Sequence, residues 1–569
     1  MQANDAQLSV ESLDSTSSSQ YVKTAIGTAS GDEYGAIEGF NIDGSHEPKF
    51  GPASSIPPER RKKVIIVGAG VNGIQQASVL LRDGYVKHKD IQIFDALEDF
   101  GGVWQKNKYP GCACDVPSMI YTTSYFVNKK YTHFFAERSE IQEYYEDFAH
   151  NYRLEQSAQF STFVRACFWD EEHLAWHVRV SNNRTGRDEY WLADIVCQCV
   201  GSLDRPVVGD TPDREKYQGV TWHTAHWRHD YDLTGKNVAI IGCGPSVAQI
   251  IPKIVDRTKH LTIYMRSPPL CVPRNDFAFS SLFRFACRFV PLFAWLMRTA
   301  MNLFLIKTGQ QNALEGAHRN EKLTKAAREL LESQVPDPEL REKLRTDQKY
   351  FCKRPLILDD FYPALSRPNC TVLRDQLVRY TEKGVVSTDY KTGEESEREY
   401  DVIIFGTGFN VSQFLGHEKI IGLDGLDLQE KWKVHPEALY GLATSQFPNM
   451  FFCFGPNSAH VWSSQQDNWE QQARFAAKAV KESILRERAG VKFAMHPRGD
   501  VEREYNLVVQ KKQGKFVWSN PACVSYYKLS DGWNVYMMPW TWWEFRRMLR
   551  KINWNEWEVL EKPLTTTKI

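Results

Sequence analysis

The 569-residue sequence lacks an excess of either charge, because Lys+Arg and Asp+Glu both number 70. This balance gives no indication that nucleic acid or an anionic surface is a general partner of the protein. The N-terminal residues MQANDAQLSV contain neither a basic region nor an apolar run, so no secretory signal is predicted. A cytoplasmic protein is therefore expected.

The sequence also lacks cysteines at the spacing of a usual zinc site. The 12 cysteines are scattered, and the pairs Cys112/Cys114 and Cys197/Cys199 are each separated by one residue, which is too close for zinc ligands. Without an export signal, the simplest expectation is that these cysteines are reduced thiols. No metal site is predicted.

The chain does contain two glycine-rich loops of the dinucleotide-binding type, each behind an apolar strand. The first, VIIVGAGVNG, carries Gly68, Gly70 and Gly73 and leads 22 residues later to Asp95 in IQIFD. Such glycines let a pyrophosphate reach the N–H groups at a helix N-terminus, and the carboxylate accepts hydrogen bonds from an adenosine 2′-hydroxyl. This pattern predicts a nucleotide with an unphosphorylated ribose, such as FAD.

The second loop, NVAIIGCGPSVAQ, differs from the first in the charge that follows it. Gly242, Gly244 and Ser246 form the predicted turn, and Arg266 ends the next strand, LTIYMR. An arginine at this position suits a 2′-phosphate, so the second nucleotide is predicted to be NADPH. Val247 stands where glycine or alanine is expected, which loosens the match where the helix packs. The two loops together indicate electron transfer between cofactors.

The order of strands, glycine turns and helices predicts an α/β protein with two Rossmann-like dinucleotide-binding domains and a helical insert. Residues 1–60 are serine-rich and end in Pro57-Pro58, so a disordered tail is expected there. The buried strand in DVIIFGTGF, residues 401–409, is expected to return the chain to the first domain. The predicted boundaries are 61–215 and 401–569 for the FAD-binding domain, 216–280 and 346–400 for the NADPH-binding domain, and 281–345 for the insert.

The most apolar stretch, residues 282–306, is interrupted by Arg284, Arg288 and Arg298 and by Pro291. Three arginines would be costly inside a membrane-spanning helix. Their spacing places them near one helical face and leaves the rest apolar. The favoured interpretation is a helical insert that packs over the substrate site, and attachment to a membrane surface is the alternative.

Between the two loops, the segment YQGVTWHTAHWR (217–228) resembles the fingerprint of the class B flavin monooxygenases of Baeyer–Villiger type, FxGxxxHxxxW followed by Pro or Asp. Gly219, His223 and Trp227 match, whereas Tyr217 replaces Phe and Arg228 replaces Pro or Asp. The related N- and S-oxygenating enzymes carry Tyr or Phe where Trp227 stands. The resemblance implies that His223 couples the domains as the nicotinamide cofactor moves.

The resemblance extends over roughly residues 62–550. GGVWQKNKYPGCACDVPSMIY (101–121) is similar to the family segment around FAD, with matches at Gly102, Trp104, Asp115 and Tyr121. KRPLILDDFY (353–362) is similar to the family's Lys-Arg-Pro segment, which implies Lys353 beside the NADPH phosphate and Arg354 over the flavin. GTG at 406–408 stands where many relatives have ATG.

Arg354 and Asp115 are the predicted catalytic residues. A fixed guanidinium in a water-poor site stabilises the negative charge of an attacking oxygen and of the resulting adduct at a carbonyl. Arginine stays protonated throughout such a reaction, and Asp115 would orient it. The alternative for this pair is an ordinary structural salt bridge.

The predicted function is FAD- and NADPH-dependent Baeyer–Villiger oxygenation of a ketone by O2, giving an ester or lactone. A bulky, hydrophobic ketone such as a polyketide or terpenoid is expected from the aromatic C-terminal part, with Trp533, Trp540, Trp542 and Trp543. An N- or S-oxygenating flavin monooxygenase is the second hypothesis, and a non-catalytic nucleotide-binding protein is the third. A membrane-anchored scaffold is the least favoured.

Overall fold

The computed structural model describes residues 53–411, 414 and 418–564. Most of the predicted N-terminal tail, residues 1–52, lies outside the described residues. Its last part forms two short 3-10 helices, η1 (Ala53–Ser55) and η2 (Pro58–Arg60), and Arg61 Nε donates to the Ile56 carbonyl at 2.8 Å. The predicted disorder is therefore wrong for residues 53–60, because the start of the first strand holds this segment.

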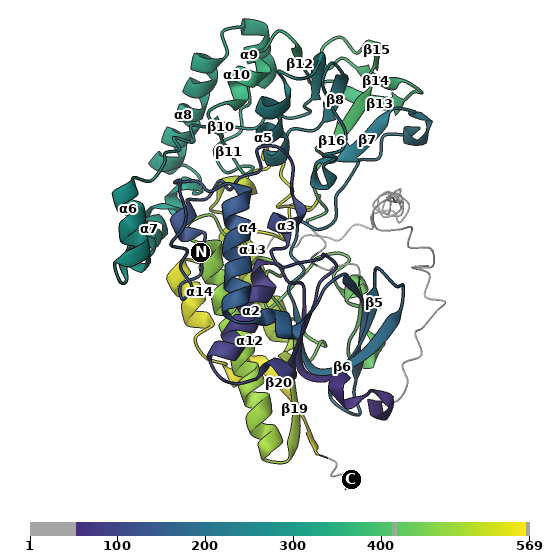
Figure 1. The fold of residues 1–569 in the computed structure, drawn as a ribbon, viewed down its shortest axis with the longest axis vertical. Coiled ribbons are helices and arrows are strands. Elements are labelled where there is room, and N and C mark those ends of the chain that lie inside the picture. The colour runs from purple at the N-terminus through teal and green to yellow at the C-terminus, as the bar shows by residue number, and fades with distance from the viewer. Residues whose placement is uncertain (1–52, 412–413, 415–417, 565–569) are drawn as a thin grey trace, which may run out of the picture.

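Two sheets with parallel centres organise the protein, one in each half of Figure 1. The first sheet follows the order β17 (Lys419–Ile421), β4 (Thr162–Asp170), β5 (Ala175–Asn182), β6 (Asp188–Gln198), β1 (Arg61–Val67), β2 (Ile91–Phe94) and β3 (Ala158–Gln159), with β18 (Met450–Phe452) paired to β6. β1 pairs in parallel with both β2 and β6. Its apolar run is continuous because both faces of the sheet are covered.

The second sheet contains the second glycine loop. Its order is β12 (Cys370–Leu373), β9 (His260–Tyr264), β8 (Asn237–Ile241), β16 (Val402–Phe405) and β7 (Val220–His223). The strand predicted at 401–409 is β16, and it pairs in parallel with β8 and β7. The prediction that it returns the chain to the first domain is wrong, because a buried apolar strand that ends on glycine fits either parallel sheet. The chain rejoins the first sheet only at β17 and β18.

Smaller elements complete the fold. A three-stranded antiparallel sheet joins β13 (Gln376–Tyr380), β14 (Gly384–Thr388) and β15 (Glu395–Glu399). Two-stranded pairs join β10 (Cys271–Val272) to β11 (Leu356–Ile357) and β19 (Val491–Pro497) to β20 (Trp557–Pro563). Further helices are α3 (Val103–Lys106), α4 (Arg138–Asn151), α5 (Pro245–Ile254), α10 (Phe361–Leu365), α11 (Leu428–Lys431), α13 (Gly499–Gln513) and α14 (Trp542–Met548). The predicted α/β class is confirmed.

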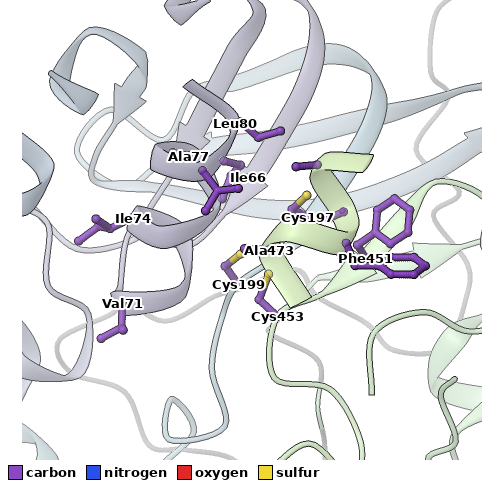
Figure 2. Packing of buried hydrophobic residues seen from close by; sticks show 14 of the residues in the cluster. Ile66, Val71, Ile74, Ala77, Leu80, Cys197, Cys199, Phe451, Cys453 and Ala473 are labelled. Atoms are coloured by element: carbon purple, nitrogen blue, oxygen red, sulfur yellow. The ribbon is translucent and has the colours of Figure 1, made fainter. Parts of the chain in front are cut away.

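Helix α2 (Val71–Arg82) follows the first glycine loop and packs against α12 (Gln465–Arg488). Figure 2 shows the apolar side chains of α2 gathered over β1 and beside three cysteines, Cys197, Cys199 and Cys453. Burial raises the pKa of the Cys197 and Cys199 thiols well above the ordinary value, so these thiols are protonated apolar side chains of the core.

The predicted helical insert consists of α6 (Ser281–Phe289), α7 (Phe293–Thr308), α8 (His318–Gln334) and α9 (Pro338–Leu344). The axes of α6 and α7 are bent by 108° at the break between them, which contains Pro291. Arg284 and Arg288 are exposed on α6, but Arg298 is buried on α7. The prediction that all three arginines share one helical face is therefore wrong. Among the described residues, no single helix is long and apolar enough to cross a membrane.

Two departures from the patterns expected from the sequence meet beside the second glycine loop. Val247 lies on α5, and Gly406 follows β16 at the same edge of the sheet. A Cβ atom on Gly406 would lie 2.0 Å from Val247 Cγ2, so an alanine at 406 has no room while valine stands at 247. The larger Val247 on the helix and the smaller Gly406 after the strand therefore compensate each other in volume.

Replacing Gly406 by alanine is expected to lower the free energy of unfolding by about 1–3 kcal/mol, because an added methyl group overpacks a close contact. In a Val247→Ala background the same replacement is expected to cost much less, since the opposing methyl is gone. Urea unfolding of the wild type, both single variants and the double variant measures the coupling between the two positions. Additive effects would show that the two residues do not share this space.

Candidate functional site

The first glycine loop connects β1 to the N-terminus of α2. Gly68 has φ of +103°, and a Cβ there would lie 2.6 Å from the Cys199 carbonyl oxygen, so only glycine fits this turn. Gly70 is the N-cap of α2, and no side chain among the described residues caps that helix. Gly73 packs against the loop, where a Cβ would meet the Gly68 carbonyl at 1.9 Å. The uncapped N–H groups of the first turn fit a pyrophosphate.

Asp95 lies directly beyond the end of β2 and supports the glycine loop. Its carboxylate accepts the Ala69 N–H at 2.5 Å and the Leu97 N–H at 2.7 Å. Burial raises the pKa of Asp95 to about 6. The lone pairs that remain on the two oxygens are the ones that the predicted ribose contact requires.

The segment 101–121 covers the first loop. Gly102, with φ of +56°, lies against Gly70, where a Cβ on Gly102 would be 2.8 Å from the Gly70 Cα. The indole N–H of Trp104 donates to the Tyr121 hydroxyl at 3.0 Å, and the two rings meet edge to face. Burial raises the pKa of Tyr121, so its hydroxyl is neutral. The predicted FAD-contacting residues of this segment are thus held together beside the first glycine loop.

The second glycine loop repeats the geometry of the first between β8 and α5. Gly242 has φ of +99°, and Gly244 is the N-cap of α5; among the described residues other than its chain neighbours, none has a heavy atom within 4 Å of a Cβ placed on Gly244. Ser246 lies in the first turn of α5, where its side chain contacts the Tyr109 hydroxyl. This second helix N-terminus likewise fits a pyrophosphate.

Two cations lie together beyond the second loop. Arg266 is exposed just beyond the end of β9, and the half-buried Lys353 is close enough for Arg266 to affect its titration. Burial and then the charge of Arg266 lower the pKa of Lys353. Two like charges at one place are unfavourable on their own, and an anion such as a 2′-phosphate would relieve the repulsion.

Asp115 and Arg354 form a two-pronged ion pair, although they are 239 residues apart in the sequence. Arg354 Nε donates to Asp115 Oδ2 at 2.9 Å, and Arg354 Nη2 donates to Oδ1 at 2.5 Å. The charge of Asp115 raises the pKa of Arg354 well above the ordinary value. The guanidinium side chain is 48% exposed, so part of its surface is open to a bound molecule.

Three tyrosines that the sequence analysis did not single out flank this pair. Tyr526 contacts Tyr527, and Tyr527 stacks on Tyr536 with ring centroids 5.6 Å apart. Arg354 affects the titration of all three hydroxyls. Burial raises the pKa of Tyr526 well above its ordinary value, so its hydroxyl is neutral, and the residue is 48% exposed. Arg354 therefore has an aromatic wall of three tyrosine rings beside it.

The fingerprint residues lie just before, on and after β7, at the edge of the second sheet. The Tyr217 hydroxyl donates to the Tyr400 carbonyl at 2.8 Å, which explains why a tyrosine is accommodated in the phenylalanine position. Burial lowers the pKa of His223 to about 4, so this imidazole is neutral near pH 7. Trp227 packs edge to face against Trp222, and Arg228 forms an exposed ion pair with Asp230. The predicted domain-coupling role of His223 stays a prediction.

The covering segment also connects the two nucleotide-binding units. The Tyr109 hydroxyl donates to Gln249 Oε1 at 2.9 Å, and Gln249 Nε2 donates to the Ala113 carbonyl at 3.0 Å. Gln249 lies on α5, so the residues just before Asp115 are docked on the second unit.

Comparison with known proteins identifies the family. The family described as flavin-binding monooxygenase-like matches residues 61–440. The chain is 34% identical over 507 residues to a Baeyer–Villiger monooxygenase of Pseudomonas aeruginosa, covering 89% of this chain and 93% of the relative. It is 32% identical over 523 residues to the FAD-binding monooxygenase BOA2 of Botryotinia fuckeliana, covering 90% and 97%.

The chain belongs to the flavin-binding monooxygenase family. The predicted resemblance is thereby confirmed. Solved structures share the fold of this flavin-binding monooxygenase: a closed form of cyclohexanone monooxygenase has a TM-score of 0.76 at 22% identity, covering 88% of this chain and 100% of the other. A complex of OTEMO with FAD and NADP has a TM-score of 0.76 at 21% identity, covering 88% and 99%.

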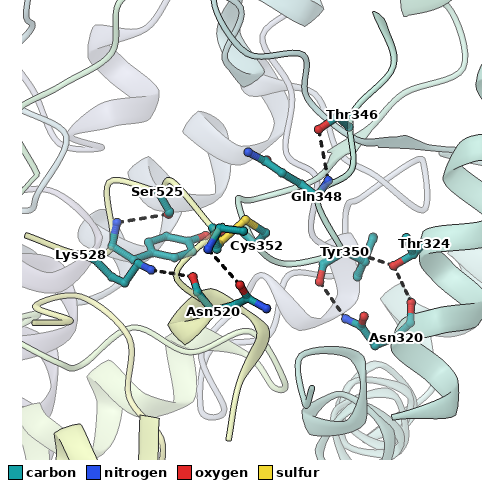
Figure 3. Close-up of a disulfide and its surroundings, with 12 residues drawn as sticks. Asn320, Thr324, Thr346, Gln348, Tyr350, Cys352, Asn520, Ser525 and Lys528 are labelled. Atoms are coloured by element: carbon teal, nitrogen blue, oxygen red, sulfur yellow. Dashed lines mark hydrogen bonds between the residues drawn. A yellow bond between two sulfur atoms is a disulfide. The ribbon is translucent and has the colours of Figure 1, made fainter. Parts of the chain in front are cut away.

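The monooxygenase also contains a disulfide that the sequence analysis did not predict. Cys352 and Cys523 are bonded, with Cα atoms 5.5 Å apart and a sequence separation of 171 (Figure 3). The expectation that all cysteines are reduced thiols is wrong for these two. Spacing alone could not reveal the pair, because only the fold brings the two segments together. The disulfide ties the residue before Lys353 to the segment that contains Tyr526 and Tyr527.

The tryptophans expected to mark a substrate site pack elsewhere. Trp533 stacks on His435, and the Trp540 indole donates to the Tyr505 hydroxyl at 3.0 Å. Trp542 is buried, and Trp543 packs against it on α14. The segment CVSYY (523–527) instead supplies Tyr526 and Tyr527 of the aromatic wall.

Thiol titration of the denatured, unreduced monooxygenase is expected to find ten reactive thiols, and twelve after reduction, because ten of the 12 cysteines are free. Cys352→Ser is expected to raise the unreduced count by one, since it releases Cys523. The matched control Cys287→Ser removes a free thiol and should lower the count by one. Twelve reactive thiols in the unreduced wild type would contradict the disulfide.

Proposed function

We propose that this enzyme is a Baeyer–Villiger monooxygenase. Its reaction inserts one oxygen atom of O2 beside a ketone carbonyl, and the products are an ester or lactone, NADP⁺ and water. The other oxygen atom leaves as water, and NADPH with a proton supplies the electrons and hydrogen. The observation that carries the proposal is the Asp115–Arg354 pair with the tyrosine rings beside it.

The first loop and its covering segment would hold FAD. The α2 N-terminus faces the pyrophosphate, Asp95 binds the ribose, and the Gly102–Trp104–Tyr121 group covers the flavin side of the loop. The uncapped α2 N-terminus and the absence of room for a Cβ at Gly68 and Gly73 support this fit.

The second loop would hold NADPH. Gly242, Gly244 and Ser246 surround the α5 N-terminus, and Arg266 with Lys353 binds the 2′-phosphate. When bound, the flavin in its reduced form supplies activated oxygen. The nicotinamide supplies the hydride that reduces the flavin.

Arg354 would stabilise the negative charge that develops where oxygen meets the substrate carbonyl. Asp115 fixes the guanidinium in one orientation through both carboxylate oxygens, so no reorganisation is needed as charge develops. The raised pKa keeps Arg354 charged over the whole working range of pH. The wall of Tyr526, Tyr527 and Tyr536 offers an apolar ketone an aromatic contact surface beside Arg354.

N- or S-oxygenation is the second candidate, because enzymes of that type share the same pair of nucleotide-binding loops. It needs no permanent cation to stabilise an oxyanion, so it leaves the Asp115–Arg354 pair without a catalytic role. Comparing cyclic ketones with amines and thioethers as oxygen acceptors distinguishes the two reactions. A preference for amines or thioethers would overturn the Baeyer–Villiger proposal.

Arg354→Ala is expected to lower the yield of ester by on the order of 10²- to 10³-fold, because the oxyanion loses its fixed cation. FAD binding and reduction by NADPH should persist, so oxygen consumed is released as hydrogen peroxide. Ester by mass analysis, peroxide and NADPH consumption are measured together.

The control for this prediction is Arg257→Ala, which removes an exposed arginine that pairs with Asp232. That variant should keep the wild-type ratio of ester to peroxide. Arg354→Lys keeps the charge but not the two-pronged geometry and should give an intermediate ratio. Ester formation by Arg354→Ala at the wild-type rate would refute the role of Arg354.

Arg266→Ala is expected to reduce the preference for NADPH over NADH by on the order of ten- to a hundred-fold in kcat/KM, the usual effect of losing a hydrogen bond to a charged group. Lys353→Met should act in the same direction. Steady-state kinetics with both coenzymes measure the ratio. If neither variant changes the ratio, the 2′-phosphate is bound by other residues.

The lowered pKa of Lys353 predicts a pH dependence. Burial and the charge of Arg266 favour the neutral amine. As the pH rises, Lys353 therefore loses its positive charge earlier than an ordinary lysine, whose pKa is about 10.4. The kcat/KM for NADPH should therefore fall with rising pH before that value is reached, whereas the kcat/KM for NADH should not show this fall. The decrease should be absent in Lys353→Met.

A further inference from the structure

The hairpin of α6 and α7 exposes large apolar side chains. The most exposed are Leu282, Leu292, Phe289, Phe304, Phe285 and Leu296, which are 54–77% exposed. Figure 1 shows the two helices at one edge of the molecule, beside the body that holds both sheets. Contiguous exposed apolar side chains of this kind mark an interaction surface.

The two faces of α6 differ in their exposure to solvent. Leu282, Phe285 and Phe289 fall on one face at helical spacing and point to solvent, whereas Cys287 is buried on the opposite side. Arg284 and Arg288 are exposed one helical turn apart, on the flank next to the apolar face. This helix thus has an apolar face with a cationic edge.

Helix α7 fixes the orientation of the hairpin. Its inward side carries the buried Arg298, which forms an ion pair with Asp467 of α12 and donates to the Thr122 carbonyl at 3.0 Å. Asn302 donates to the other oxygen of Asp467 at 2.5 Å. Turning the apolar face inward would break this buried pair, which is strongly unfavourable. The exposure of the apolar face is therefore built into the fold.

The charged side chains within the hairpin segment are of one sign. Residues 277–314 contain no aspartate or glutamate. Arg284, Arg288 and Lys307 of this segment are exposed. A surface with this composition attracts an anionic partner that is apolar just below its charged layer.

We infer that the α6–α7 hairpin docks the enzyme on the surface of an anionic phospholipid bilayer. The apolar face of α6 and the outward side of α7 enter the boundary of the acyl chains, and Arg284, Arg288 and Lys307 contact lipid phosphates. The 108° bend between the two helices lets the pair lie in the plane of the surface.

A second copy of the chain fits this surface less well. A symmetric contact through the hairpin would bring the exposed cations of both copies together, and residues 277–314 offer no acidic side chain to pair with them. A lipid surface supplies phosphates to those cations and acyl chains to the apolar face at the same time. The charge pattern therefore favours lipid.

Co-sedimentation of the FAD-loaded full chain with vesicles tests the inference. The wild type is expected to sediment with phosphatidylcholine vesicles that contain phosphatidylserine, and less with phosphatidylcholine alone. The triple variant Leu282→Ser/Phe285→Ser/Phe289→Ser should bind on the order of ten-fold more weakly or worse to both. Arg284→Gln/Arg288→Gln should lose about five-fold per charge on the mixed vesicles only.

Matched controls remove exposed groups elsewhere. Val434→Ser/Leu485→Ser/Leu507→Ser removes three exposed apolar side chains outside the hairpin, and Lys322→Gln/Arg328→Gln removes two exposed charges from α8. Both controls should bind vesicles like the wild type, and the yellow flavin spectrum checks the folding of every variant. Equal losses in the control and hairpin variants would refute docking through α6 and α7.

Light scattering on the same proteins separates lipid from a second copy. The proposal expects the hairpin variants to change vesicle binding and to leave the molar mass in solution unchanged. A wild type that stays in the supernatant with both kinds of vesicle would overturn the inference. So would a dimer that the triple apolar variant converts to a monomer, if neither protein binds vesicles.

Discussion

The contact between the Asp115 carboxylate and the Arg354 guanidinium is the constraint on which the geometry of the proposed site depends. Each partner is fixed from its own side. The segment before Asp115 is held on α5 through Tyr109 and Gln249. Arg354 follows Cys352, which is bonded to Cys523 in the segment of the aromatic wall. The ion pair is therefore anchored through α5 on one side and through the disulfide on the other.

Electrostatics divides this part of the molecule into two regions. Arg354 is neutralised in part by Asp115 and remains charged, which suits transient negative charge during a reaction. Arg266 and Lys353 stand close together, and this arrangement suits an anion that stays bound. The two regions are adjacent because Lys353 and Arg354 are neighbours in the chain. A single short segment thus would serve both the nicotinamide nucleotide and the reacting atoms.

The sequence predicted the elements whose local pattern determines them. The glycine loops, Asp95 and the ladder of apolar strands follow from spacing, and Asp115 with Arg354 came from the family resemblance. The sheet that holds Val402–Phe405 could not be predicted, because its hydrophobic pattern fits both sheets equally. The Cys352–Cys523 bond and the burial of Arg298 against Asp467 depend on long-range contacts that leave no trace in local spacing. Pro291 predicts a break in the apolar helix, but the sequence does not predict the direction that the chain takes after it.

The contact between Val247 and Gly406 has a consequence for anyone who redesigns this enzyme by consensus. Each residue is a departure from consensus when the two motifs are compared separately with those of relatives. A consensus design would therefore replace each of them. Alanine at position 406 alone would place its Cβ 2.0 Å from Val247 Cγ2. A smaller residue at position 247 alone would leave a void beneath α5. The two sites must be exchanged as a unit, so motif libraries built one position at a time would discard the combination that works.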